Sequence, residues 1–316
     1  MKTDIEFNRL ARRVRWKRWL ITIGIAVVVS FGLVVGGYQL LQHLAAKSSD
    51  RDMDYLQVTA EILAPNLQSS DRYLANTTIQ GGQVVSHRYK EIAGQRVAWS
   101  PAVTNYSWLG TELGTAINAT DWGNTRQDRV YDRITQQRVP QFYNVSRRPT
   151  KTDPRWQQDL ATVARTSHQV AEVALTFKHP LTYAAIQRKL PRSLTAAWYW
   201  IGTKASASPE LTNDYLGIAG GDDGAPGTGR LTTTNYRYFR SALKQANREF
   251  GGTLRTGGLD VFKFGAQYAK RYPSLQTAKF AGVIVTGNSA AFKQLGHPDW
   301  VAASSAGIVM PQTAIQ

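Results

Sequence analysis

The longest uninterrupted hydrophobic stretch of the chain covers residues 19–42 and reads WLITIGIAVVVSFGLVVGGYQLLQ, without a charged residue. As a helix it would be about 36 Å long, enough to cross a hydrocarbon core of about 30 Å. The pattern predicts a transmembrane helix. Two alternatives remain. A soluble core helix is rarely this long and apolar on every face, and a cleaved signal peptide, ending near 44–46, has a shorter apolar region.

The charges on either side of this segment are unequal. Seven basic residues precede it with only two acids, whereas the basic residues just beyond it are balanced by three aspartates. By the positive-inside rule, the amino terminus is cytoplasmic and residues 43–316 lie outside the cell membrane. The main topology determinants are Arg12, Arg13, Arg15, Lys17 and Arg18.

Two glycines inside the apolar segment, Gly32 and Gly36, have the small-xxx-small spacing that lets helices approach closely. This spacing makes them candidates for a homodimer contact. Glycine is also frequent in membrane helices that do not pair.

Residues 43–54 are polar and predict a tether. Alternation of apolar and polar residues over 55–62 predicts a half-buried strand. Residues 83–92 and 96–106 predict a hairpin turning at Ala93 and Gly94, with Pro101 limiting the second strand to a sheet edge or a break.

The second half of the chain alternates strands and helices without a nucleotide motif. We expect the strand over 169–177 to end at His179-Pro180, and residues 204–234 to form a glycine-rich loop. The predicted strands are 169–177, 194–202, 280–286 and 301–310, and the predicted helices are 182–190, 235–250, 258–272 and 288–295.

These elements predict an α+β ectodomain of two domains, the first mostly β, on one N-terminal transmembrane helix. The expected boundaries are 1–18 for a basic cytoplasmic tail, 19–42 for the membrane helix, 43–54 for the tether, 55–146 for the membrane-proximal domain, 147–165 for a linker with a short helix, and 166–316 for the C-terminal domain.

Composition and charge indicate the compartment of the folded part and the surfaces that it would attract. The chain has no cysteine, which excludes thiol chemistry and is typical of the outside of a bacterium with a single membrane that does not rely on disulfides. Removing the seven basic and two acidic residues of 1–18 from the totals of 38 and 22 leaves 31 and 20, a net charge of +11 outside. That charge would attract membrane lipid and anionic wall polymers, whereas the topology argues against direct nucleic-acid binding.

Few residues are candidates for catalysis or for binding a metal or a cofactor. None of the five histidines has metal-ligand spacing, no catalytic residue stands out, and neither a metal nor a cofactor is predicted. Asp222 and Asp223 lie in a glycine-rich loop that suits either a hard cation or a plain turn, and the turn is favoured. Tyr199 should face away from Trp198 and Trp200 on one strand, with core packing favoured over an exposed ligand platform.

Three segments resemble blocks of the sigma factor regulator C-terminal domain. They are VALTFKHPLTYAAIQRKLP at 173–191, AAWYWIGT at 196–203 and FAGVIVTGNSAAFKQL at 280–295. The arginine-flanked anchor is similar to the N-terminal region of the same proteins. The resemblance implies a membrane-bound regulator of a Gram-positive bacterium, presumed to be an anti-sigma factor for an extracytoplasmic-function sigma factor. The chain departs from many anti-sigma factors, because residues 1–18 contain neither histidine nor cysteine for a zinc-binding module.

We therefore expect a non-enzymatic regulator whose outer part senses or binds a signal. Its state would pass inward through helix association or through proteolysis at 45–54, and the tail would contact a sigma factor or another membrane regulator. The alternative is a membrane-anchored module that binds anionic cell-wall polymers or a lipid surface.

Overall fold

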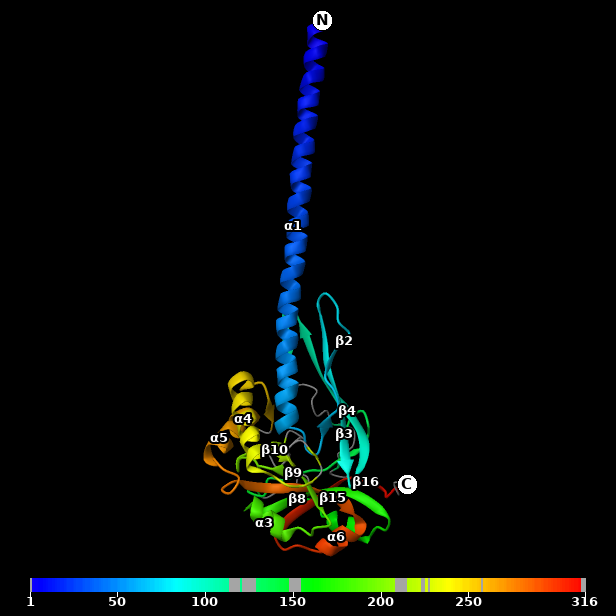
Figure 1. Ribbon diagram of the computed structural model, residues 1–316, viewed down its shortest axis with the longest axis vertical. Helices are drawn as coiled ribbons and strands as arrows, with labels where there is room; N and C mark the ends of the chain where they lie inside the picture. Colours follow the sequence, from blue (N-terminus) through cyan, green and yellow to red (C-terminus); the bar gives the residue numbers. More distant parts are fainter. Residues whose placement is uncertain are drawn as a thin grey trace.

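The computed structural model describes residues 2–113, 120, 129–147, 155–207, 215–222, 225–226, 228–256 and 258–313. One helix, α1 (Lys2–Ile62), projects from a folded body that contains the other described elements (Figure 1). The carboxyl end of α1 is buried in that body, whereas the amino end stands clear of it.

Helix α1 continues through the segments expected to form a tether and a strand, so both expectations were wrong. The reason lies in a stripe of buried residues along the helix, spaced alternately by four and three positions. The stripe consists of Ala45, Ser49, Asp52, Leu56, Thr59 and Leu63. Such spacing places side chains on one helix face, but four of the six are small or polar, which hides the hydrophobic period.

The stripe packs against the first sheet, which is entirely antiparallel and has the strand order β1-β3-β4-β5, with β2 also paired to β3. The region 55–146 therefore contains helix as well as sheet. The strands are β1 (Gln68–Ser69), β2 (Tyr73–Ala75), β3 (Gly81–Ile92), β4 (Gln95–Ser107) and β5 (Gly110–Glu112).

The hairpin of β3 and β4 confirms its prediction, including the turn. Ala93 and Gly94 both have positive φ angles, of 50° and 83°, as tight hairpin turns require. Pro101 lies where the β3–β4 register shifts, and β4 pairs with β5 only from residue 105 onward. Its missing N–H therefore interrupts no ladder, because this part of β4 is an edge.

The second sheet has the order β10-β9-β15-β8-β16, with all neighbours antiparallel. It confirms the four strands predicted in the second half of the chain. The strands are β8 (Gln169–Thr182), β9 (Thr195–Trp200), β10 (Gly217–Ala219), β15 (Lys279–Asn288) and β16 (Val301–Pro311).

Strand β8 does not end at His179-Pro180, contrary to expectation. Its pairing with β15 shifts register there, so that Leu181 pairs with Phe280 but Thr176 pairs with Gly282. The irregularity accommodates the proline, and the strand resumes beyond it.

Five helices and three short strand pairs complete the described part of the body, and all four predicted helices are confirmed. The helices are α2 (Leu160–Arg165), α3 (Tyr183–Lys189), α4 (Thr233–Phe250), α5 (Val261–Arg271) and α6 (Ser289–Leu295). The short strands are β6 (Val130–Tyr131), β7 (Arg138–Val139), β11 (Gly221–Asp222), β12 (Ala225–Pro226), β13 (Arg255–Thr256) and β14 (Leu259–Asp260).

One hydrophobic cluster joins α1, both large sheets and helices α4 and α5. The ring of Tyr55 on α1 packs edge-on against Phe250, with centroids 5.0 Å apart, and against Phe262 at 6.2 Å. Because its end is part of this core, α1 cannot move relative to the body without exposing apolar surface.

The three aromatic residues of β9 lie as predicted. Tyr199 belongs to the main cluster, whereas Trp198 and Trp200 pack on the opposite face with Phe142 and Tyr215. All are buried, so core packing is confirmed and neither face is an exposed platform.

Candidate functional site

The residues singled out from the sequence do not converge on one site. Arg12, Arg13, Arg15, Lys17 and Arg18 are exposed on the free part of α1. Every residue from 12 to 40 is exposed, and the helix is long and apolar enough to cross a membrane. A Cβ atom added at Gly32 or Gly36 would meet nothing within 4 Å, so that face is uncovered in the single chain.

The acidic loop is only partly described. Asp222 ends β11, and Asp223 lies outside the described residues. Within the described ranges, no three His, Asp or Glu side chains gather as a metal site would require.

The structure instead brings together three polar side chains at the base of α1. Lys90 on β3 donates hydrogen bonds to both carboxylate oxygens of Glu172 on β8, at 2.9 and 2.8 Å. The Asn66 amide, just beyond α1, donates to Glu172 Oε1 at 2.8 Å. This trio, called the junction here, ties the end of α1 and the first sheet to the second sheet.

The junction is removed from water. Both side chains of the ion pair are buried, and the Lys90 ammonium lies 4.3 Å from the centre of the Trp99 ring. Burial lowers the pKa of Lys90, and the attraction of Glu172 opposes that change. Removing one partner of such a pair leaves a buried charge without compensation.

A second polar layer lies beside the first. Arg88, two residues before Lys90, donates through Nε to the carbonyl oxygen of Ser100 at 2.8 Å. The Ser100 hydroxyl donates to Asp132, which also accepts the N–H of Thr135 at 2.8 Å. Burial lowers the pKa of Arg88 to about 10, against the opposing attraction of Asp132.

Asp52 is a further buried charged residue, on the face of α1 that packs against β4. It is fully buried, and neither carboxylate oxygen has a hydrogen-bond partner of normal geometry among the described residues. Burial raises the pKa of Asp52 to about 6, although the Thr104 hydroxyl and the charge of Arg51 oppose the rise.

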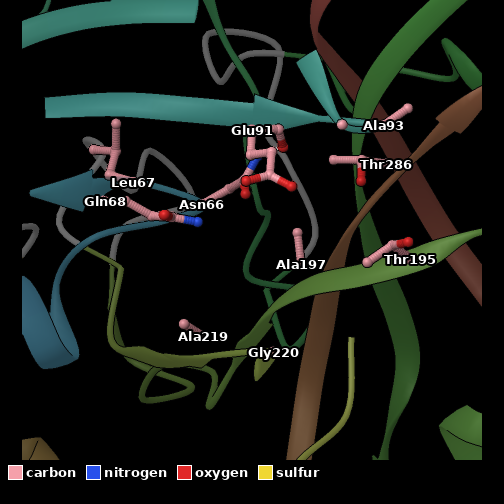
Figure 2. A pocket seen from close by; sticks show the side chains of 11 residues that line it. Asn66, Leu67, Gln68, Glu91, Ala93, Thr195, Ala197, Ala219, Gly220 and Thr286 are labelled. Carbon is pink, nitrogen blue, oxygen red and sulfur yellow. The ribbon is translucent and has the colours of Figure 1, made fainter. Parts of the chain in front are cut away.

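A cavity of about 40 Å³ lies next to the junction. Figure 2 shows that Asn66, Glu91, Ala197, Ala219 and Thr286 line it, from segments far apart in the sequence. Small-molecule sites usually have about 300–1,000 Å³, whereas this cavity has room for one to a few waters. The arrangement suits a mechanical joint between elements better than a binding pocket.

Comparison with known families supplies the identity. A model described as sigma factor regulator N-terminal matches residues 8–97, and one described as sigma factor regulator C-terminal matches residues 165–308. The chain belongs to the sigma factor regulator family. No match was found among curated proteins or among solved structures.

In this sigma factor regulator, the junction joins the two matched regions. Asn66 and Lys90 lie in the N-terminal region, and Glu172 lies in the C-terminal region. The family is regulatory and implies an interaction with a sigma factor, consistent with the partner expected from the sequence.

Sequence reasoning missed the junction and Asp52. An acid within the buried strand QVAEVALTF was an available signal, because an unpaired carboxylate is costly in a core. Its partner Lys90 is 82 residues away in the sequence, and one sequence alone does not indicate which cation it meets.

Proposed function

We propose that this sigma factor regulator is a non-enzymatic, single-pass membrane protein that controls an extracytoplasmic-function sigma factor as an anti-sigma factor. Residues 1–18 would be cytoplasmic, residues 19–42 would span the membrane, and the folded body would lie outside. The observation that carries the proposal is the exposed surface of α1 from residue 12 to residue 40. Helix α4, in contrast, packs its apolar face on the body.

Continuity of α1 supports a route for the signal. The same helix contains the apolar segment and the buried stripe that enters the core, without an intervening loop. A change in the outer body would therefore move the helix itself, by rotation, by translation or by altered pairing at Gly32 and Gly36. Proteolysis at 45–54 would first require release of this helix from the first sheet.

Recognition of the sigma factor would fall to the tail. The tail carries seven basic and two acidic residues, and such a segment favours an acidic surface on its partner. The partner would be the sigma factor or a second membrane regulator that binds it.

Topology can be tested with single cysteines, because the chain has none of its own. Asn8→Cys reports on the tail, and Ile134→Cys reports on an exposed position of the body. In intact cells, a membrane-impermeant maleimide should label Ile134→Cys only, and permeabilised cells should give both signals. Equal labelling of both variants in intact cells would contradict the proposed topology.

A pull-down with the full-length protein tests the proposed binding to a sigma factor. Full-length protein solubilised in mild detergent should recover a sigma factor, and a variant with Arg12, Arg13 and Arg15 changed to glutamine should recover less. Recovery of none by the wild-type chain would remove the anti-sigma assignment while leaving the topology intact.

A second candidate function rests on the charge of the outer part. Its net charge of +11 favours binding to an anionic wall polymer. Such binding should weaken steeply between about 50 and 500 mM salt, because screening shortens the range of the attraction. Retention on isolated cell wall that is indifferent to salt would argue against it.

A further inference from the structure

We propose that the open end of the first sheet inserts into the outer lipid interface beside α1. This end, called the tip here, consists of the turn 76–80 between β2 and β3 and the turn 107–110 between β4 and β5. The inference rests on the membrane anchoring proposed above and adds a second contact between the protein and the bilayer.

The tip carries apolar side chains and no charged residue, unlike most of the chain. Residues 73–86 and 97–111 contain no charged side chain, although charged residues make up 19% of the sequence. Ile79, Trp108 and Leu109 are 57%, 38% and 78% exposed. Outside α1, most of the exposed large hydrophobic residues of the described chain are in or next to the tip, including Tyr73 and Leu74.

The tip lies at the level where the membrane helix leaves the lipid. The closed end of the β3–β4 hairpin lies beside Asn66 at the base of α1, and the twelve residues of β3 extend roughly 40 Å from there. That distance corresponds to about 26 residues of helix, which reaches the end of the apolar segment 19–42. Figure 1 shows the sheet rising alongside α1 toward its amino end.

The pattern of burial along α1 independently indicates the same height for the outer membrane surface. Residues 12–40 are exposed, Leu41 and Gln42 are half-buried, and Ala45 is the first fully buried residue. Strand β5, which follows the turn 107–110, contacts α1 directly. The outer bilayer surface set by residues 19–42 therefore meets the tip.

The two turns are held together before any contact with lipid. The Trp108 N–H donates to the carbonyl oxygen of Gln80 at 3.1 Å, and the Thr78 N–H donates to that of Gly81 at 2.7 Å. The Ser107 hydroxyl accepts the N–H of Leu109 at 3.2 Å. Insertion would therefore order little additional backbone, which lowers the entropic cost of binding.

These features favour lipid over a charged molecule as the binding partner of the tip. Tryptophan favours the boundary between headgroups and acyl chains, and neighbouring leucine and isoleucine side chains are buried below it. Because the tip has no charge, its contact with lipid should not depend on salt, unlike an attraction based on the +11 body.

The test uses spin labels on the full-length chain in vesicles of phosphatidylethanolamine and phosphatidylglycerol. Leu109→Cys and Ile79→Cys report on the tip, and Val28→Cys reports on the apolar part of α1. Ile134→Cys is the matched control, because it is 65% exposed but lies two residues from Asp132, which binds Ser100 in the middle of β4. Collision with oxygen, which partitions into lipid, is compared with collision with a water-soluble nickel complex.

We expect the oxygen-to-nickel collision ratio at Leu109→Cys and Ile79→Cys to exceed that of Ile134→Cys at least fivefold, in both 50 and 500 mM salt. A ratio equal to that of Ile134→Cys, with Val28→Cys in lipid, would overturn the tip contact and leave the anchoring intact. Tip labels shielded from both reagents would indicate a second copy or another protein and would also overturn it. Accessibility of Val28→Cys to nickel would instead overturn the anchoring itself, and the tip contact with it.

Discussion

Lys90 Nζ lies 2.8 Å from Glu172 Oε2, and both side chains are buried where the two family-matched regions meet. Asn66 adds a hydrogen bond to the same carboxylate directly beyond the end of α1. Movement of α1 away from the second sheet would therefore disturb the hydrogen bonds of this buried carboxylate. Separating the two groups while they remain buried would be costly, because each charge would lose its partner.

Breaking the ion pair on one side should be costly. Lys90→Met or Glu172→Gln should each lower the free energy of unfolding by about 3–5 kcal/mol, because the remaining group is left buried and incompletely paired. The double variant should recover much of that loss, because neither charge remains. Denaturant unfolding measures all three.

The surface pair of exposed Arg248 and half-buried Glu249 offers the control. Glu249→Gln should change stability by about 0–1 kcal/mol, as is typical of surface pairs. Single variants of the buried pair that cost no more than this control would show that the junction contributes little.

Asp52 should make stability depend on pH. Its pKa is raised from 3.8 to about 6, so the folded state disfavours the ionised form. The penalty is absent below about pH 3.8, grows as the pH rises to about 6 and is complete above it. Asp52→Asn should therefore stabilise the protein at pH 7.5 by on the order of 3 kcal/mol, and by about 2 kcal/mol less at pH 4.5.

Thermal melting at the two pH values checks this expectation. Asp54→Asn is the matched control, because Asp54 is exposed on the same helix, and its effect should be small and nearly constant with pH. An advantage of Asp52→Asn that does not grow between pH 4.5 and pH 7.5 would refute the buried-carboxylate account.

The continuity of α1 beyond residue 42 predicts the effect of a proline. Lys47 is exposed in α1, and proline there removes a helical hydrogen bond and clashes with the preceding turn, at about 3 kcal/mol or more. Lys47→Pro should increase cleavage between residues 43 and 50 at least tenfold in limited proteolysis. Lys47→Ala should behave as wild type, and equal cleavage of both variants would mean that this part of α1 is not a packed helix.

Pairing of two chains through the apolar segment 19–42 of α1 remains a prediction from the sequence. With His43→Cys as a crosslinking site, Gly32→Leu plus Gly36→Leu should reduce disulfide-linked dimer at least tenfold in membranes, because the larger side chains keep the backbones apart. Gly37→Leu lies about 100° around the helix from Gly36 and should crosslink as wild type. Undiminished dimer in the double variant would exclude this face.

Strong local patterns in the sequence predicted much of the body. The strand over 280–286, the helix over 288–295 and the hairpin at Ala93-Gly94 are all confirmed, and Asn288 caps that helix. In each, the residues that determine the element are its own, so hydrophobic period and capping chemistry are sufficient.

The errors came from elements determined by distant residues. Residues 55–62 alternate like a strand, but Ala45, Ser49 and Asp52 place them on a helix whose buried face is partly small and polar. The junction was not predictable, because Asn66 and Glu172 are 106 residues apart in the sequence. Strand β8 continues beyond Pro180 because its pairing with β15 shifts register there.

Because α1 is continuous, rotation of one end about the helix axis is coupled to rotation of the other. Each residue of α1 turns the chain by about 100°, so the direction in which Arg12 or Arg15 points is set by how many residues separate it from the stripe that begins at Ala45. Adding or removing one residue between positions 19 and 40, all of which are exposed, would turn Arg12 and Arg15 to another side of the molecule while leaving the buried stripe in place. Segment length, and not only its composition, is thus part of the information that this chain encodes.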